Sequence, residues 1–302
     1  MHNSLTSLYT WVVIPEFKRL KVITPEYRSI SSQRFMYKYE GQLLHESHDD
    51  DGILEVIETQ GVRSLHFGSP ARQSSMRLIA PDILELSYVR AMMAWLLFTD
   101  APEKVLIIGL GGGSITKYLL HHFEQVQIKA VEYRKSVVKI ARSHFELPLD
   151  PRLKIIIEDG GLYVRQRSES LENQFNLLIL DAFDHEGMAE SLCNPAFFDA
   201  CKNVLRSDGI LILNLWRSDK ALFDKISWWL GQSFNARLLF LPVPDKGNII
   251  GFAFAENVAC CSMKRLRERA QQLEACHQIE FSAFLREFKR HNIHSTSKII
   301  TS

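Results

Sequence analysis

Small and acidic residues recur at the ends of four apolar runs in this 302-residue chain. They form a G-x-G-x-G loop and three later acidic positions: Gly109, Gly111, Gly113, Glu132, Asp159 with Gly160, and Asp181. Glycines let the backbone approach a ligand, and the N–H groups of the following helix face it. The first acid can accept both hydroxyls of a ribose, and the second can accept the exocyclic amine of an adenine. The pattern predicts an adenosine-type ligand, with a tight turn and helix N-caps as the plain alternatives.

The length of the glycine loop separates two classes of adenosine ligand. A nicotinamide dinucleotide site usually carries G-x-G-x-x-G, and here the sixth position is Ser114. The shorter G-x-G-x-G is typical of S-adenosylmethionine-dependent enzymes, whose ligand has no pyrophosphate to bind. A sulfonium nucleoside is therefore favoured over a dinucleotide.

The elements that position these residues alternate between strand and helix from about residue 105 onward. Uninterrupted apolar strands such as NLLIL and ILILNLW are typical of a parallel sheet covered on both faces. Upstream, ILEVIET and VRSLHFG flank Gln60-Gly61 and predict a small antiparallel β domain. We also expect one helix from about Pro81 to Leu97 and one charged helix from about Met263 to His291.

The fold class is therefore α/β. A Rossmann-like sheet of the class I S-adenosylmethionine-dependent methyltransferase type, with helices on both faces, follows the small β domain. We predict an N-terminal segment with the β domain over 1–80, a nucleoside-binding catalytic domain over 81–260, and a C-terminal helix and tail over 261–302.

Composition excludes several classes of partner. A net charge of +1 gives no sign of nucleic-acid binding, and no apolar run approaches the length of a membrane span. Five cysteines without a C-x-x-C pair favour free buried thiols in the cytoplasm. Asp184-His185-Glu186 lacks a second ligand cluster, so we expect no metal site.

Several longer motifs resemble the spermidine synthase family, the polyamine aminopropyltransferases. They are VLIIGLGGGS, AVEYRKSVVKIAR, RLKIIIEDGGLYV, LLILDAFDHEGMAESL and PAFFDACKNVLRSDGILILNLW. The family's DSSDP-type element matches Asp181 to Asp184 in both acids, and Gln73 stands where the family carries a glutamine that contacts the nucleoside. The similarity extends from the small β domain to about Phe254.

The resemblance implies a chemistry and a site. Such enzymes bind decarboxylated S-adenosylmethionine, whose sulfonium makes the adjacent aminopropyl carbon electrophilic. An amine attacks that carbon and methylthioadenosine leaves. Asp181 would orient the amine and take its proton, Asp184 would hold the cationic substrate, and Tyr88 would line the amine site. The family also implies a homo-oligomer, commonly a dimer.

Three positions depart from the family pattern. Gly112 stands where the family loop, GGGDGG, has an acid for the aminopropyl ammonium. Tyr88-Val89-Arg90 replaces YHE, so a cation takes the place of an acid and would repel a polyamine if it faced the site. Val243 replaces a tyrosine of the family's P-x-YP-like loop.

Three interpretations remain open, in decreasing weight. The first is an aminopropyltransferase with an altered donor or acceptor site that still uses Asp181. The second is a methyl or other alkyl transferase that uses S-adenosylmethionine itself and releases S-adenosylhomocysteine. The third is a non-catalytic nucleoside-binding protein. A cation near the donor tail, such as Arg90 or Arg72, favours a donor that keeps its carboxylate.

Overall fold

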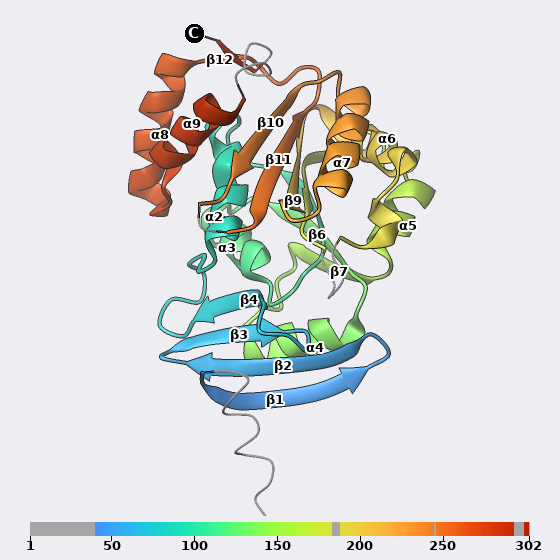
Figure 1. The fold of residues 1–302 in the computed structure, drawn as a ribbon, viewed down its shortest axis with the longest axis vertical. Coiled ribbons are helices and arrows are strands. Elements are labelled where there is room, and N and C mark those ends of the chain that lie inside the picture. The colour runs from blue at the N-terminus through green and yellow to red at the C-terminus, as the bar shows by residue number, and fades with distance from the viewer. Residues whose placement is uncertain (1–39, 183–187, 245, 293–298, 302) are drawn as a thin grey trace, which may run out of the picture.

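The computed structural model describes residues 40–182, 188–244, 246–292 and 299–301 (Figure 1). A four-stranded antiparallel sheet lies at one end of the molecule, and a seven-stranded sheet with helices on both faces forms the rest. This arrangement confirms the predicted fold class.

The small sheet has the order β1-β2-β3-β4, with β1 at Gln42–Asp49, β2 at Gly52–Thr59, β3 at Val62–His66 and β4 at Arg72–Arg77. Gln60 and Gly61 both have positive φ, 50° and 75°, as a two-residue hairpin between β2 and β3 requires. β4 was not foreseen, because its sequence RQSSMR carries a single apolar residue. Its serines are buried all the same.

The large sheet has the order β10-β11-β9-β8-β5-β6-β7. The strands from β5 to β9 are mutually parallel, and β11 lies antiparallel between β9 and β10. Their bounds are β5 Lys104–Ile108, β6 Gln127–Glu132, β7 Leu153–Ile157, β8 Phe175–Leu180, β9 Leu205–Trp216, β10 Leu238–Pro242 and β11 Asn248–Phe254. Two short strands, β12 (Cys261–Ser262) and β13 (Ile300–Thr301), pair in parallel.

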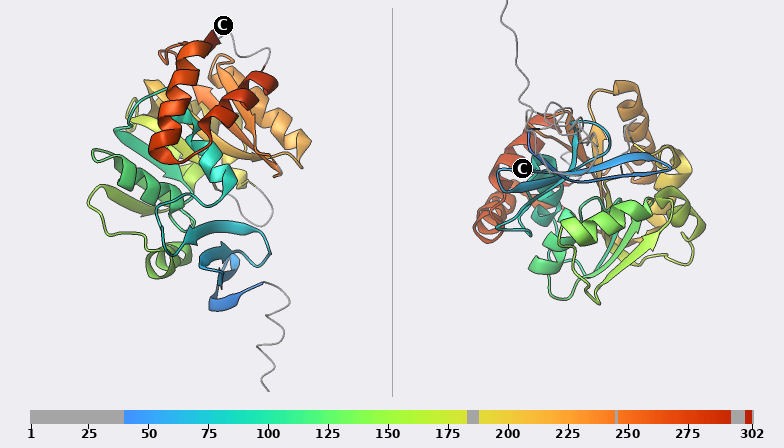
Figure 2. Two further views of the ribbon diagram at one scale, coloured as in Figure 1. Left: turned by 90° about the vertical axis from the view of Figure 1, so that its left-hand side faces the viewer. Right: turned by 90° about the horizontal axis from the view of Figure 1, so that it is seen from below.

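Helices cover both faces of the large sheet (Figures 1 and 2). One face carries α2 (Ser87–Met92), the 3-10 helix η1 (Met93–Leu97), α3 (Ser114–His122), α8 (Met263–His277) and α9 (Phe281–His291). The other carries α5 (Gly160–Gln166), α6 (Pro195–Val204) and α7 (Lys220–Ser233), with η2 (Glu190–Leu192) beside them. α4 (Lys135–His144) packs Val137 and Ile140 against the small sheet and so joins the two sheets.

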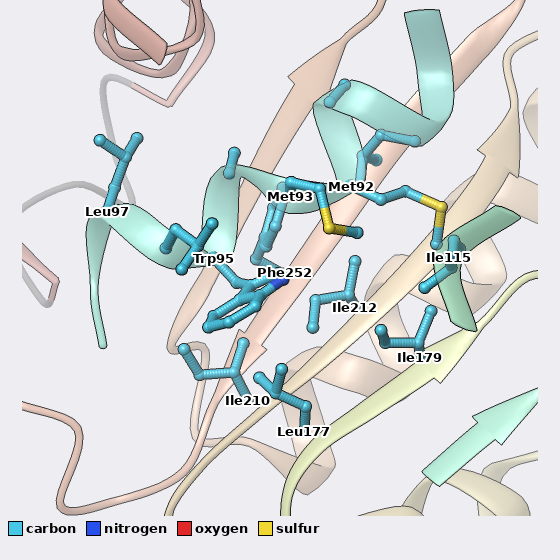
Figure 3. Close-up of a cluster of buried hydrophobic side chains, with 14 of the residues drawn as sticks. Met92, Met93, Trp95, Leu97, Ile115, Leu177, Ile179, Ile210, Ile212 and Phe252 are labelled. Atoms are coloured by element: carbon cyan, nitrogen blue, oxygen red, sulfur yellow. The ribbon is translucent and has the colours of Figure 1, made fainter. Parts of the chain in front are cut away.

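The apolar cluster on the first face shows why α2 and η1 form there. Met92, Met93 and Trp95 lie over Ile210, Ile212 and other strand residues, and all five of these named side chains are fully buried (Figure 3). The same cluster includes Phe281 and Phe288 of α9. The C-terminal helices therefore pack on the large sheet as part of its core.

Two helix predictions were wrong in detail. The expected helix at 81–97 begins only at Ser87, so Pro81 lies before it, and its second half is a 3-10 helix. The expected single helix at 263–291 is a pair, because Gln278 takes a left-handed conformation with φ 54° and ends α8. The division into 1–80, 81–260 and 261–302 stays a prediction.

Two further sequence expectations can be compared with the structure. In the described part of the chain, no helix is long and apolar enough to cross a membrane. Cys201 and Cys261 are buried as expected of structural thiols, whereas Cys260 and Cys276 are exposed.

Candidate active site

The candidate site lies where the order of the parallel strands reverses, between β5 and β8. In open α/β sheets, ligands bind outside the carboxyl ends of the strands at this point. The backbone N–H of Asp181, just after β8, donates to the Ile108 carbonyl at 2.9 Å. The N–H of Gly109, just after β5, donates to the Val131 carbonyl at 2.9 Å. The glycine loop, the strand of Glu132 and Asp181 are thus held together by the sheet itself.

The first glycine of the loop is needed for packing as well as for turning. Gly109 has φ 91°, and a Cβ there would collide with the backbone carbonyl of Asp181. A side chain at 109 would therefore push the carboxylate-bearing residue out of place. This close approach is a structural reason for glycine, independent of any ligand.

Strand β4 lies directly on the glycine loop. The hydroxyl of Ser74 is 3.1 Å from that of Ser114, and Ser114 Oγ donates to the Ser75 carbonyl at 3.2 Å. A Cβ at Gly111 would lie 3.7 Å from the carbonyl oxygen of Gln73. The structure therefore brings Gln73 to the loop, on a strand that the sequence pattern did not reveal.

Glu132 ends β6 with its carboxylate turned toward the backbone. Its Oε2 accepts the N–H of Leu110 and its Oε1 accepts the N–H of Arg134, both at 2.9 Å. The residue is only 8% exposed, and this burial raises the pKa of its carboxyl although the backbone N–H groups of Arg134, Leu110 and Gly111 act in the opposite direction. Carboxylate oxygens keep further acceptor capacity after two such bonds.

Asp159 and Gly160 stand at the neighbouring strand end. Asp159 Oδ1 accepts the N–H of Leu162 at 2.7 Å and so caps α5, which is the plain alternative considered for this acid. A Cβ at Gly160 would collide with the side chain of Ile108, so this glycine lets α5 pack against β5. Both positions therefore have structural roles, and their contact with a ligand stays a prediction.

Asp181 and Tyr88 meet across the site. Tyr88 Oη lies 3.3 Å from Asp181 Oδ2 and 3.4 Å from the Gln73 carbonyl oxygen, and its hydroxyl can donate to either. Burial of the Asp181 carboxyl raises its pKa to about 6, opposed by the hydrogen bonds from Asn214 and Tyr88. Burial and the neighbouring Asp181 charge also raise the pKa of Tyr88. A carboxyl group that titrates this close to neutral pH is suited to exchange a proton with a substrate.

Two asparagines behind Asp181 were missed from the sequence. Asn214 Nδ2 donates to Asp181 Oδ1 at 3.0 Å, and Asn248 Nδ2 donates to Asn214 Oδ1 at 2.9 Å. They are 3% and 8% exposed, on β9 and β11. The available signal was a polar residue within the otherwise apolar run ILILNLW, because such a residue requires a partner when the strand is buried.

Gly112 and Val243, two of the positions that differ from the family pattern, are closely packed against other residues of the protein. A Cβ at Gly112 would lie 2.7 Å from Ser74 Oγ and 2.9 Å from Phe145 Cδ1. A side chain there would meet the small sheet and the end of α4. Val243 is buried in the apolar cluster on the first face of the sheet. Neither residue offers a charge or an aromatic wall to a polyamine.

Arg90 is held by groups of the protein. Its Nε lies 3.0 Å and 3.1 Å from the two carboxylate oxygens of Glu280, and its Nη1 donates to the carbonyls of Leu84 and Glu85. The guanidinium is thus neutralised by the residue that precedes α9. Arg90 was expected to repel a polyamine if it faced the site, and these contacts give no support for such repulsion.

Two candidate features need separate mention. Asp184, and with it the Asp184-His185-Glu186 motif, lies outside the described residues. Among the residues that are described, no three His, Cys, Asp or Glu side chains are grouped so as to hold a metal ion.

Comparison with known proteins places the chain in a family. Residues 85–262 match the model of the spermine/spermidine synthase domain. A polyamine aminopropyltransferase from Neisseria meningitidis serogroup A is 36% identical over 239 residues, which are 78% of this chain and 89% of that protein. The chain belongs to the spermine/spermidine synthase family of transferases, as the motifs indicated.

Solved structures agree with this placement at the level of the fold. A spermidine synthase in complex with the transition-state analogue AdoDATO superimposes with a TM-score of 0.64 at 20% identity, covering 85% of this chain and 88% of that one. Human methyltransferase-like protein 13 in complex with S-adenosylhomocysteine superimposes with a TM-score of 0.56 at 24% identity, covering 67% of this chain and 93% of that one. A spermidine synthase and a methyltransferase-like protein thus share the fold of this chain.

Proposed function

We propose that this protein transfers the aminopropyl group of decarboxylated S-adenosylmethionine to an amine and releases methylthioadenosine. The observation that carries the proposal is the partly buried pair of Asp181 and Tyr88, whose Oδ2 and Oη atoms lie 3.3 Å apart at the point where the strand order reverses. The function of the Neisseria relative supports the same reaction. Asp181 is the general base, and Tyr88 holds the amine beside it.

The donor lies along the carboxyl ends of β5, β6 and β7. In this proposal Glu132 accepts the ribose hydroxyls, and Asp159 accepts the exocyclic amine of the adenine. The remaining donor contacts come from the loop, from β4 and from the start of α5: Gly109, Gly111, Gly113, Gln73 and Gly160. Asp184 contributes a second negative charge for the cationic acceptor.

The reaction step needs one proton acceptor. The amine nitrogen attacks the aminopropyl carbon next to sulfur, the carbon–sulfur bond breaks, and its electrons stay on sulfur as a thioether. The proton leaves the nitrogen for the Asp181 carboxylate. An acceptor whose pKa is about 6 is half ionised at that pH and largely ionised above it, so it can act as a base in neutral solution.

Transfer of a methyl group from S-adenosylmethionine is the second candidate. It is favoured by one observation, the packed glycine at 112, because the family's acid for the aminopropyl ammonium has no counterpart there. In this case the product would be S-adenosylhomocysteine. Arg90 adds no argument for a donor carboxylate, because it is paired with Glu280.

Parallel calorimetric titrations with decarboxylated S-adenosylmethionine, S-adenosylmethionine and methylthioadenosine test the donor. We expect the decarboxylated donor to bind tightest, and an amine screen then follows with Asp181→Asn as the inactive control. Tighter binding of intact S-adenosylmethionine, with methyl transfer in the screen, would overturn the proposal. The wider setting proposed with this function is a cytoplasmic homodimer that acts on a polyamine or a related amine.

A further inference from the structure

The carboxylate of Asp181 is the last member of a row of three polar side chains, Asn248, Asn214 and Asp181, which lies across β11, β9 and the end of β8. Leu180 of β8 pairs with Leu213 of β9, so the next residues, Asp181 and Asn214, stand side by side. Asn248 of β11 pairs with Trp216, two residues from Asn214 on the same side of the sheet. The hydrogen bonds run from Asn248 to Asn214 to Asp181, at 2.9 Å and 3.0 Å.

The direction of this row follows from what each group can donate. An ionised carboxylate can only accept hydrogen bonds, so Asn214 must turn its amide nitrogen toward Asp181. Its amide oxygen then faces Asn248, which must in turn present its own nitrogen. Both asparagines are buried, and a reversed amide would leave two buried acceptors facing each other. The row therefore favours the ionised form of Asp181.

The two oxygens of Asp181 are consequently not equivalent. Oδ1 accepts the fixed amide of Asn214, whereas Oδ2 faces the rotatable hydroxyl of Tyr88. That hydroxyl has a second acceptor, the Gln73 carbonyl, at 3.4 Å. When Oδ2 takes a proton, the Tyr88 hydroxyl can turn its hydrogen to Gln73 and accept from the new acid. Oδ2 can thus be protonated without leaving either residue unpaired.

We propose that Asn248 and Asn214 are positioning residues that reserve Asp181 Oδ1 as a permanent acceptor and make Oδ2 the atom that receives the substrate proton. In the balanced step, an N–H bond of the amine breaks, an O–H bond forms at Oδ2, and the nitrogen lone pair forms the new carbon–nitrogen bond as the carbon–sulfur bond breaks. The inference rests on the proposed function in one respect, the role of Asp181 as the base.

Few other groups in the described structure lie close enough to Asp181 to affect its protonation. Among the described residues, Tyr88 from α2 is the titratable side chain whose contact with Asp181 is established. β9 and β11 bring the uncharged amides of Asn214 and Asn248, and β5 brings the carbonyl of Ile108. A change in either asparagine therefore acts on Asp181 without removing a neighbouring charge.

The test is a graded set of variants, Asn214→Leu, Asn248→Leu and Asn292→Leu, read by the pH dependence of kcat at saturating substrates. Removing the direct donor in Asn214→Leu should move the acidic midpoint upward by about one pH unit or more. Asn248→Leu should move it less, in the same direction. The amine's own titration is common to all variants and cancels in the comparison.

Asn292→Leu is the matched control. Asn292 is also a buried amide, 4% exposed, and it bonds to the backbone N–H and carbonyl of Phe240 on β10, away from Asp181. Its loss should lower stability without moving the pH midpoint. The inference would be overturned if the acidic midpoint of kcat were the same in all three variants as in the unaltered protein. It would also be overturned if that midpoint shifted equally in all three variants.

A second measurement needs no activity. The pKa of Asp181 is raised in the folded state, so its contribution to the free energy of unfolding is greatest below about pH 4 and is lost as pH rises through about 6. The difference between each protein and the same protein carrying Asp181→Asn isolates this loss. In Asn248→Leu the loss should extend to higher pH, and an unchanged window would count against the row. If Asp181→Asn keeps full activity while the window still moves, the proposed function fails and the electrostatic role of the row stands.

Discussion

Glu132 and Asp181 are both acids at the carboxyl ends of parallel strands, and desolvation raises the pKa of each carboxyl, yet their hydrogen-bond partners differ in kind. Glu132 accepts backbone N–H groups of Leu110 and Arg134, which the fold fixes in place. Asp181 accepts from an amide and a hydroxyl on side chains, and the hydroxyl can rotate. The first arrangement is suited to a permanent acceptor for a ligand, and the second to a group that changes its protonation.

The strongest way to break this comparison is Asp181→Asn. The change keeps the shape of the side chain but removes the proton acceptor, so we expect kcat to fall by roughly 10²- to 10⁴-fold while the donor still binds. Steady-state kinetics with an amine acceptor and calorimetry with the donor would measure the two effects separately. Asp219→Asn, an isosteric change at the N-cap of α7, is the control and should leave kcat unchanged. A fall in donor affinity that explains the whole loss would contradict the assignment.

Glu132→Gln should have the opposite pattern, with weaker binding of the donor and a smaller change in kcat. Because both carboxylate oxygens accept N–H groups, the amide nitrogen of a glutamine would face a donor wherever it turned. We expect the dissociation constant of the donor to rise by roughly 10- to 100-fold, with a smaller effect on kcat at saturation. Glu158→Gln removes a charge that is paired with Arg167, at the neighbouring strand end, and serves as the matched control. Equal donor affinities in the two variants would exclude the proposed role of Glu132.

The comparison also shows what the sequence could reveal. Acids at strand ends and a glycine loop were readable, because strand ends and tight turns have local signals in residue type and spacing. The partners of Asp181 could not be predicted from residue type and spacing, because Tyr88 and Asn214 contact it from two different elements and Asn248 contacts Asn214 from a third, through pairings that only the folded sheet defines. β4 was missed for a related reason, because its buried serines pack on the loop and give no apolar alternation.

The second half of the glycine loop differs from the first in what its glycines pack against. Gly112→Ala would bring a Cβ to 2.7 Å from Ser74 Oγ and 2.9 Å from the Phe145 ring, so we expect the free energy of unfolding to fall by about 1–3 kcal/mol. Ser74→Gly in the same chain should recover part of this loss. Gly231→Ala is the control, because a Cβ on that face of α7 meets nothing within 4 Å and a helix prefers alanine by up to about 1 kcal/mol. Equal stability of the two alanine variants, measured by urea unfolding, would show that the loop has room for an acid.

Substitutions of Arg90 test whether this cation affects binding of the amine or only stabilises the fold, and we expect them to have the smallest effect. Its ion pair with Glu280 is partly exposed, with side chains 27% and 41% accessible, so Arg90→Ala should cost about 1 kcal/mol of stability. The KM for the amine should stay within about twofold, because the guanidinium is already neutralised by Glu280 and two backbone carbonyls. Glu280→Gln tests the same pair from the other side, since it leaves Arg90 charged and without its carboxylate. A lower KM in Arg90→Ala would mean that the cation repels the amine after all. A higher KM in Glu280→Gln alone would mean that this ion pair is what keeps the cation from the acceptor.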